Sequence, residues 1–412
     1  MPFQSYLRFA AANRRFVAFG FLAAFGSSFG QTYFIGIFGP SIQGEFGLSH
    51  TAWGTIYMIG TLASALLLPW TGKQIDRLDL RLYTSLACLL LIGACLATAA
   101  TLGPLMLVVA IFLLRQAGQG LMSHIALTSM ARYFDVGRGR AIAIAALGFS
   151  SGEALLPFLA VLAIGLAGWR WTYGGVAFGV GLAILPALLW LLKGHGERHR
   201  SHMRRLSDAS HGAHRAISWT RGQVMRDPNF YLLLIGILAP SLILTAMFFH
   251  HLNLAAAKGW SNAWITGNYV VYAVATVATS LSSGPLIDRL GAVRLVPFML
   301  APLTLAMIVF GLFDSPFAVW PYFVLAGLST GVGHTSVSAM WAEVYGVQHL
   351  GAIKSLVAAL GVFASALGPV AMGGLMDLGV PIGTVCLIFA GYTVIGAVTI
   401  MMGLKGYRRQ PV

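Results

Sequence analysis

The sequence Gly72-Lys-Gln-Ile-Asp76-Arg77 returns 212 residues downstream, at residue 284 against residue 72, as Gly284-Pro-Leu-Ile-Asp288-Arg289. Pro157 recurs at the same offset as Pro369, so the register holds well beyond the motif. Apolar segments flank both copies. A chain that repeats itself once, in phase and in an apolar background, is predicted to contain two copies of one membrane module.

The composition points to lipid surroundings. Hydrophobic residues make up 58% of the 412 residues and charged residues only 9%. A soluble protein could not keep so large an apolar fraction away from water. The three cysteines, Cys88, Cys95 and Cys386, all lie in apolar runs, and their number and spacing fit neither a disulfide framework nor a zinc site. We expect no metal and no cofactor.

Twelve apolar runs are long enough, at about 20 residues, to cross a bilayer as helices. They lie near residues 16–39, 53–71, 81–101, 104–127, 139–166, 170–192, 230–252, 264–284, 294–313, 316–341, 351–376 and 380–404. The first is too long for the core of a cleaved signal peptide, so we expect it to be retained. The predicted fold is all-α and membrane-spanning, with twelve transmembrane helices in two pseudo-symmetric six-helix bundles, residues 1–192 and 230–412.

Basic residues are distributed unevenly between the two sides of the predicted membrane protein. If the N-terminus is cytoplasmic, 23 of the 26 Lys and Arg lie inside, only Arg170 and Lys258 lie outside, and Arg115 is left within a span. This bias predicts a multi-pass protein of an inner or plasma membrane with both termini in the cytoplasm. The net charge of +14 then favours anionic lipid over nucleic acid, because the basic residues are scattered over every inner loop.

Residues 193–229 are the one clear shift in composition, and they would join the two bundles on the cytoplasmic side. The segment contains five histidines among arginines: His195, His199, His202, His211 and His214. One interpretation of this composition is a metal-sensing role. However, the interleaved arginines would repel a cation, which favours a solvated tether.

The repeated motif offers three kinds of residue at the predicted cytoplasmic ends of the helices. Its glycines allow close helix approach, its aspartates could meet the positive N-terminal end of a helix from the opposite half, and its arginines could pair with an acid or a carbonyl. The six residues are Gly72, Asp76, Arg77, Gly284, Asp288 and Arg289. We interpret them as a latch that closes in one state and opens in the other, and the alternative is an ordinary polar turn. Asp79 stands where the second copy has Gly291, so the first turn is expected to be less tight.

Two Gly-x-x-x-Asp-Arg turns between apolar segments resemble the loop signature of the major facilitator superfamily, a large family of two-domain secondary transporters, and the likeness covers essentially the whole chain. A narrower resemblance concerns helices 4–6. Arg138-Gly-Arg140-Ala141, Gly148-x-x-x-Gly152 with Pro157, and Gly168-Trp-Arg170 look like the corresponding region of monocarboxylate and oxalate–formate porters. Helix 5 lacks the Gly-Pro dipeptide typical of drug–proton antiporters.

The eighth apolar run departs from the monocarboxylate pattern. That family places an Asp and an Arg inside helix 8, whereas residues 269–280 carry no charge here. Any bound anion would therefore have to rely on Arg115 and His334.

Two opposite charges are predicted at similar depth on neighbouring helices. Arg115 lies midway along helix 4, where an arginine costs about 2.5–3.5 kcal/mol on insertion scales unless it has a partner or a wet cavity. Its surroundings, Arg115-Gln-Ala-Gly118-Gln-Gly120, are similar to the superfamily's helix-4 Arg-x-x-x-Gly motif with shifted glycines. Glu153, near the middle of helix 5, invites an ion pair. The pair could be static, or it could break and remake around a substrate or a proton.

Other polar residues fall within the predicted spans. His334, in the middle of helix 10, is a candidate proton carrier or donor to a substrate, or else a satisfied interhelical histidine. Gln31 and Tyr33 lie near the middle of helix 1 and could line a cavity. His250 and His251 end helix 7 near the outer face, as gate residues or simply at the interface.

The resemblance implies a secondary active transporter that moves a small solute by alternating access, with a proton-coupled organic anion such as a monocarboxylate as the leading solute and efflux of a drug-like compound as the alternative. An enzyme would need a convergent catalytic set, and Glu153 stands alone. A transport-like sensor would need a folded soluble domain, for which the linker is too short. No Gly-rich Lys loop for a nucleotide is present. We expect a monomer whose partners are a small solute, protons and lipid, with no nucleic acid.

Overall fold

The computed structural model describes residues 8–134, 137–196, 219–346 and 349–408, with the side chains of Asp288 and Arg408 outside that description. Over these residues the chain is helical, and no strand occurs within them. The all-α prediction is therefore confirmed.

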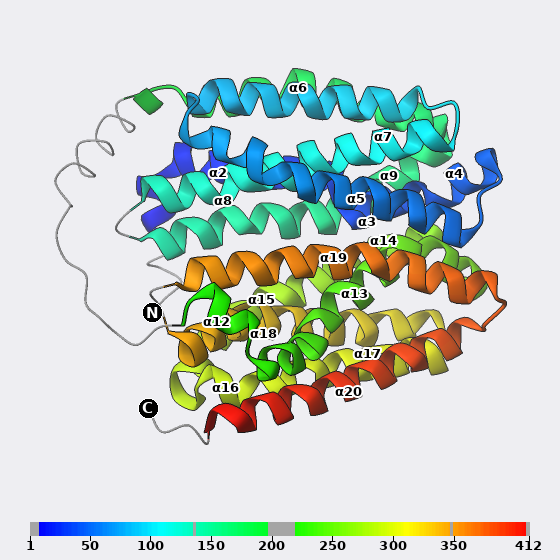
Figure 1. The fold of residues 1–412 in the computed structure, drawn as a ribbon. Helices are drawn as coiled ribbons and strands as arrows, with labels where there is room; N and C mark the ends of the chain where they lie inside the picture. Colours follow the sequence, from blue (N-terminus) through cyan, green and yellow to red (C-terminus); the bar gives the residue numbers. More distant parts are fainter. Residues whose placement is uncertain (1–7, 135–136, 197–218, 347–348, 409–412) are drawn as a thin grey trace. The chain divides into compact units, whose positions relative to one another are not determined.

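The helices follow one another with short connections (Figure 1). In the first half of the chain they are α2 (Arg14–Ser27), η1 (Ser28–Gly30), α3 (Thr32–Ile35), η2 (Gly36–Phe38), α4 (Gly39–Phe46), α5 (His50–Gly72), η3 (Lys73–Asp76), α6 (Leu80–Ala99), α7 (Pro104–Leu114), η4 (Arg115–Met122), α8 (Ser123–Tyr133), α9 (Arg138–Gly179), η5 (Val180–Ile184) and α10 (Leu185–Leu191).

The second half begins at the end of the linker. Its helices are α12 (Arg221–Met225), α13 (Pro228–Ala257), α14 (Asn262–Gly267), α15 (Tyr269–Leu290), α16 (Ala292–Leu295), η6 (Val296–Met299), α17 (Leu300–Leu312), η7 (Pro316–Ala318), α18 (Val319–Tyr345), α19 (Leu350–Asp377) and α20 (Ile382–Arg408).

Nine helices of the described chain are long and apolar enough to cross a membrane, or ten if the bent pair Arg14–Gly30 and Thr32–Phe46 forms one span. The helical stretch Arg138–Leu191 contains 54 residues. At 1.5 Å per residue it is about 80 Å long, far more than a hydrocarbon core of about 30 Å. Gly168 interrupts it with φ 79° and ψ 164°, a conformation open essentially to glycine alone, so this stretch is long enough for two spans.

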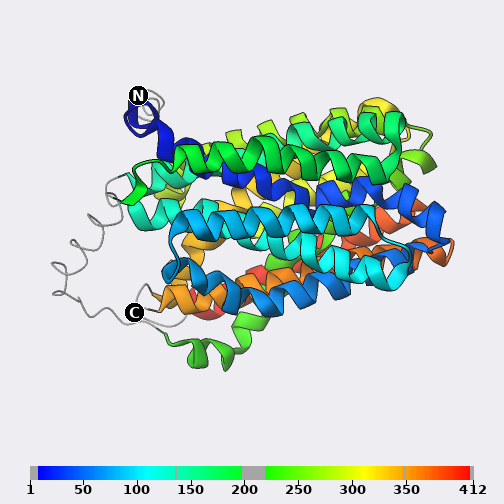
Figure 2. The same ribbon diagram turned by 90° about the horizontal axis from the view of Figure 1, so that it is seen from above.

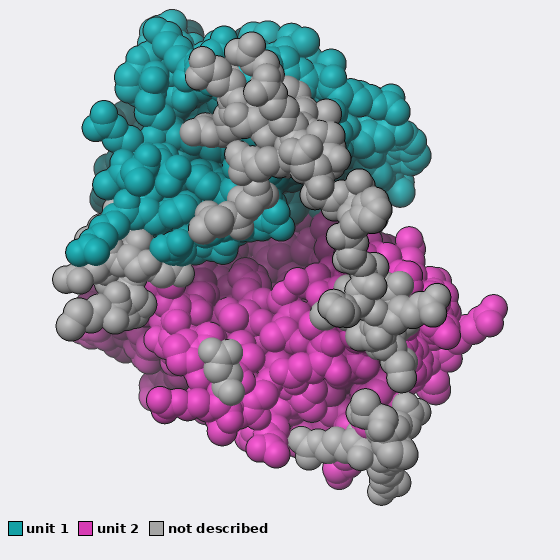
Figure 3. Space-filling view, turned by 90° about the vertical axis from the view of Figure 1, so that its left-hand side faces the viewer, with its two compact units in different colours: residues 1–38, 59–214 teal, residues 39–58, 215–412 magenta. Residues whose placement is uncertain are grey.

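The chain divides into two compact units, Met1–Phe38 with Ile59–His214 and Gly39–Met58 with Arg215–Val412, coloured separately in Figure 3. In unit 1, α2 packs against α8 and α9, and α6 against α7 and α9. In unit 2, α13 packs against α19 and α20, and α15 against α18. Figure 1 shows these helices running lengthwise, and Figure 2 gives the view from above.

Glycines set the closest helix contacts. A Cβ on Gly148 of α9 would overlap the carbonyl oxygen of Phe21 in α2, and one on Gly236 of α13 would overlap that of Gly396 in α20. Each unit thus has a crossing where only a glycine allows the two backbones to touch.

Candidate solute and proton site

The first span is broken near its middle. The 3₁₀ turn η1 ends at Gly30, and Gln31 then adopts an extended backbone with φ −84° and ψ 154° before α3 begins. The two parts of the span meet at 45°. Irregular backbone at membrane depth is tolerated only where it is buried in protein or lines a cavity. The break places Gln31 and Tyr33 at a point where the backbone itself offers polar groups.

The fourth span is irregular at the point where it meets this break. Residues Arg115–Met122 form a π-helical segment, η4, between α7 and α8. A π-helical turn accommodates an additional residue within a helix and is frequent at functional sites. It explains why the glycines of the Arg115 motif are shifted. A Cβ on Gly118 would lie 2.6 Å from the Cα of Gly30, so the two irregular segments touch backbone to backbone.

The side chain of Arg115 reaches the break in helix 1. Its side chain is 1% exposed, and Nη1 donates to the carbonyl oxygen of Gly30 at 3.0 Å and lies 3.5 Å from Oγ1 of Thr32. That carbonyl belongs to the turn where the helix ends, so Arg115 stabilises the broken conformation. Both of these contacts lie on helix 1, and neither involves Glu153. The guanidinium thus points toward helix 1, whereas the sequence had predicted Glu153 as its partner.

The remaining candidates of unit 1 surround the break. Gln31 Nε2 lies 3.4 Å from Ser123 Oγ, and the Tyr33 hydroxyl donates to Ser28 Oγ at 2.8 Å. Glu153 is half-buried on α9. It follows Gly152, where a Cβ would collide with the Ser28 hydroxyl. The structure therefore brings helices 1, 4 and 5 together at this point. His334 has an exposed side chain on α18, in unit 2.

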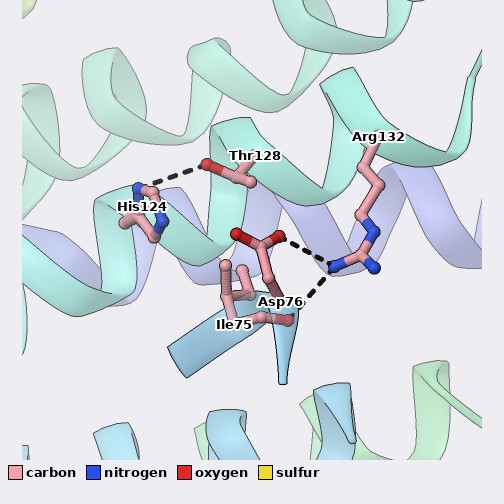
Figure 4. A network of polar contacts seen from close by, with 5 residues as sticks. All are labelled: Ile75, Asp76, His124, Thr128 and Arg132. Carbon is pink, nitrogen blue, oxygen red and sulfur yellow. Dashed lines mark hydrogen bonds and ion pairs between the residues drawn. The ribbon is translucent and has the colours of Figure 1, made fainter. Parts of the chain in front are cut away.

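The first copy of the repeated motif forms its polar contacts within unit 1 (Figure 4). Asp76 Oδ1 lies 3.1 Å from Nη1 of Arg132 on α8, and the same nitrogen donates to the Ile75 carbonyl oxygen at 3.2 Å. Thr128 Oγ1 and His124 Nδ1 are 3.2 Å apart one turn away on α8. In this structure Asp76 thus pairs with its own half. Arg132, which the motif reading did not single out, is the partner.

The turns that follow the two copies of the motif are capped in different ways. Asp79 caps the first turn of α6, where its Oδ1 accepts from the amides of Arg81 at 2.8 Å and Leu82 at 3.4 Å. Gly291 occupies the equivalent position with φ 80° and offers no side chain. There Glu343 of α18 reaches the amides that begin α16, at 2.9 and 3.1 Å. Glu343 therefore caps α16 from another helix, whereas Asp79 caps the helix that directly follows it. Arg289 is exposed, and the side chain of Asp288 lies outside the described part of the chain.

These features match a known family. The sequence profile described as the Major Facilitator Superfamily matches residues 20–369. The chain belongs to the Major Facilitator Superfamily. It is therefore a multi-pass membrane protein with a transporter fold, and it is not an enzyme.

Solved structures of similar fold agree with this membership. A bacterial homolog of the human lysosomal transporter Spinster, in an inward-facing and unoccupied conformation, has a TM-score of 0.71 at 14% identity and covers 97% of this chain and 99% of its own. The nucleoside transporter NupG has a TM-score of 0.70 at 14% identity, over 96% of this chain and 98% of its own. Curated protein sequences include no match. Such low identities support the fold alone.

Two histidines of this facilitator are buried rather than placed at its outer surface. The helix α13 continues to Ala257, and both His250 and His251 are 0% exposed. His250 Nε2 lies 2.9 Å from the Pro369 carbonyl oxygen, and the ring of His251 lies between the hydroxyls of Tyr269 at 2.7 Å and Tyr322 at 2.8 Å. The interfacial interpretation was wrong because the helix runs on for more than a turn.

One histidine of the facilitator's linker is packed against the first helix. His195 is 2% exposed and stacks on Phe16, with ring centroids 5.6 Å apart, so it is not part of a solvated tether. His199, His202, His211 and His214 lie outside the described residues. The described segments hold no group of three or more His, Cys, Asp or Glu that could bind a metal.

At the start of α13, Asp227 accepts hydrogen bonds from Tyr345, at 3.1 Å, and from Tyr407. Burial, followed by this contact with Asp227, raises the pKa of the Tyr407 phenol. No periodic pattern in the sequence marks this cluster, because its three residues lie far apart in the chain.

Proposed function

We propose that this protein is a proton-coupled secondary transporter that moves a small organic anion by alternating access. The observation that carries the proposal is the broken first span at Gln31, held by Arg115. In transporters with discontinuous helices, the positive N-terminal end of a half-helix faces anionic groups of the solute. Here the half-helix that begins at Thr32 starts beside the Arg115 guanidinium. Two sources of positive potential therefore coincide next to the polar side chains of Gln31 and Tyr33.

Glu153 is the proposed proton carrier. An ionisable residue within a membrane span is costly and usually functional. Because Arg115 is engaged by the helix 1 backbone, protonation of Glu153 does not require an ion pair between the two to break. His334 is proposed as the contribution of the second bundle, since it is an exposed polar side chain on α18.

The proposal includes the predicted topology: twelve spans, both termini in the cytoplasm of an inner or plasma membrane, bundles at residues 1–192 and 230–412 joined by the cytoplasmic linker 193–229, and a monomer. The break in helix 1, the length of Arg138–Leu191 and the 27-residue α18 together support the count of twelve. Gly72, Asp76, Arg77, Gly284, Asp288 and Arg289 would form the cytoplasmic latch in one of the two transport states.

A thermal-shift panel tests the solute class. Purified protein is heated with small carboxylates, with their neutral amide analogues, and with hydrophobic drug-like cations. We expect stabilisation by carboxylates, with the shift reduced in Tyr33→Phe. The matched control is Tyr392→Phe, which removes the same hydroxyl from a tyrosine that donates to the Ile235 carbonyl oxygen. Equal thermal shifts with the amides and the carboxylates would refute an organic anion as the solute. Stabilisation by the drug-like cations alone would favour efflux of a drug-like compound.

A further inference from the structure

The helix α5 is fixed at two places that belong to different units. Its residues up to Met58 belong to unit 2, and those from Ile59 onwards belong to unit 1. A Cβ on Gly54 would lie 2.8 Å from the carbonyl oxygen of Pro369 in α19. A Cβ on Gly60 would lie 2.8 Å from the amide nitrogen of Phe112 in α7. These two close backbone contacts are about 9 Å apart along one helix.

The first turn of α5 is capped by a carboxylate from another span. Asp377 is the last residue of α19, and its oxygens accept from the amide of His50 at 3.0 Å, from the amide of Thr51 at 2.8 Å and from the Thr51 hydroxyl at 2.5 Å. A negative side chain at a helix N-terminus satisfies amides that the helix leaves without partners and complements the helix dipole. We call Asp377 together with His50 and Thr51 the outer clasp.

A second layer lies beneath the outer clasp. Gln43 Nε2 lies 3.0 Å from His50 Nδ1, and Asn253 of α13 donates to Gln43 Oε1 at 3.1 Å. Trp53 stacks on Phe249 of α13, with ring centroids 5.2 Å apart. The segment Gly39–Met58 is thus held to α13 and α19 by polar side chains at its exposed end and by aromatic rings below them.

We infer that the outer clasp is a releasable gate that must open whenever the transporter exposes its site to the outside. A rigid helix cannot keep both its Gly54 and its Gly60 contacts once the two units rotate against each other. Both glycine contacts are buried, but the Gly54 end also carries the exposed Asp377, whose hydrogen bonds water can replace. The contact at the Asp377 end is therefore the one that opens. This inference rests on alternating access, but it is independent of the solute and of protons.

The test uses one reporter read from two sides. Ser123→Cys places a thiol beside Gln31, while the three native cysteines are buried and give the background. An impermeant maleimide is applied to right-side-out and inside-out vesicles. In Asp377→Ala we expect the labelling rate from outside to rise at least about threefold and the rate from inside to fall.

A gate predicts that the labelling rate rises from outside and falls from inside, whereas a merely structural contact does not predict opposite changes. The control Asp79→Ala removes the same kind of cap from α6, whose amides and carboxylate belong to one helix, and we expect it to shift neither rate. A rise on both sides in Asp377→Ala would indicate general loosening and would overturn the inference, as would no change.

A cross-link provides the converse experiment. A Cβ on Gly374 would lie 3.9 Å from Thr51 Oγ1, so Thr51→Cys with Gly374→Cys can form a disulfide across the clasp. With this bond oxidised, the Ser123→Cys reporter is expected to lose outside labelling and keep inside labelling, and reduction should restore the outside reaction. Outside labelling of the cross-linked protein at the uncross-linked rate would contradict the gate. Neither experiment needs a solute, so a wrong solute class would leave their result unchanged.

Discussion

Substituting Gly30 by alanine tests the contact on which the candidate site depends. An added Cβ would overlap the Leu114 carbonyl oxygen and lie 2.8 Å from both the Gln119 nitrogen and the Gly118 Cα. These are backbone atoms, which cannot turn away as a flexible side chain can. Overpacking typically costs about 1–3 kcal/mol, and the gain of up to about 1 kcal/mol from replacing glycine in a helix is small here because Gly30 ends the turn η1. We expect a net loss of about 2 kcal/mol in unfolding free energy.

The assay is reversible unfolding in mixed detergent micelles, followed by circular dichroism. Gly93→Ala is the matched control, since a Cβ on this glycine of α6 meets no atom within 4 Å; it should gain about 0.5–1 kcal/mol. Gly118→Ala should cost as much as Gly30→Ala. The double mutant should cost less than the sum, because the first substitution already separates the two segments. A Gly30→Ala protein as stable as the Gly93→Ala protein would refute the tight crossing.

Two further predictions follow from the contacts described above, and a third follows from the distribution of basic residues. Because the Arg115 guanidinium is engaged by the Gly30 carbonyl oxygen, a double-mutant cycle with Arg115→Met and Glu153→Gln should give a coupling energy below about 0.5 kcal/mol, and a value above about 2 kcal/mol would indicate an ion pair. Glu343→Ala removes the cap of α16 and should cost about 1 kcal/mol, with faster amide hydrogen exchange confined to that turn; unchanged exchange there would argue against the cap. A cysteine introduced at Lys73 should react only from the cytoplasm and one at Ser261 only from outside, and the reverse pattern would invert the topology.

The fold was predictable because its determinants are periodic. The 212-residue offset between Gly72 and Gly284 and the long apolar runs depend on composition and spacing, which any window along the chain can detect. The break at Gln31 was not predictable in this way. No proline lies between Gly20 and Gln31 to mark it, and its causes are tertiary, namely the donation from Arg115 and the close approach of Gly118.

The residues of the candidate site could be predicted from the sequence, but the contacts that their side chains make could not. Depth and charge identified Arg115 and Glu153, yet neither property determines which way a long side chain points. In the structure the Arg115 guanidinium reaches a backbone carbonyl oxygen at the end of a broken helix, and no sequence pattern shows that acceptor. The departure at Asp79 and Gly291 was visible in the sequence, whereas the compensating Glu343 lies 52 residues after Gly291 and could be found only in space.

The central claim, proton-coupled transport through Glu153, is tested most directly in proteoliposomes that enclose a pH-sensitive dye. With an acidic exterior and a carboxylate that stabilises the protein, we expect uphill uptake accompanied by internal acidification. Glu153→Gln should retain exchange of labelled for unlabelled solute and lose gradient-driven accumulation. Asp314→Asn, which changes a carboxylate that is 84% exposed and paired with Lys258, should behave as the unmodified protein. Accumulation by Glu153→Gln at the unmodified rate, with the same internal acidification, would contradict the account.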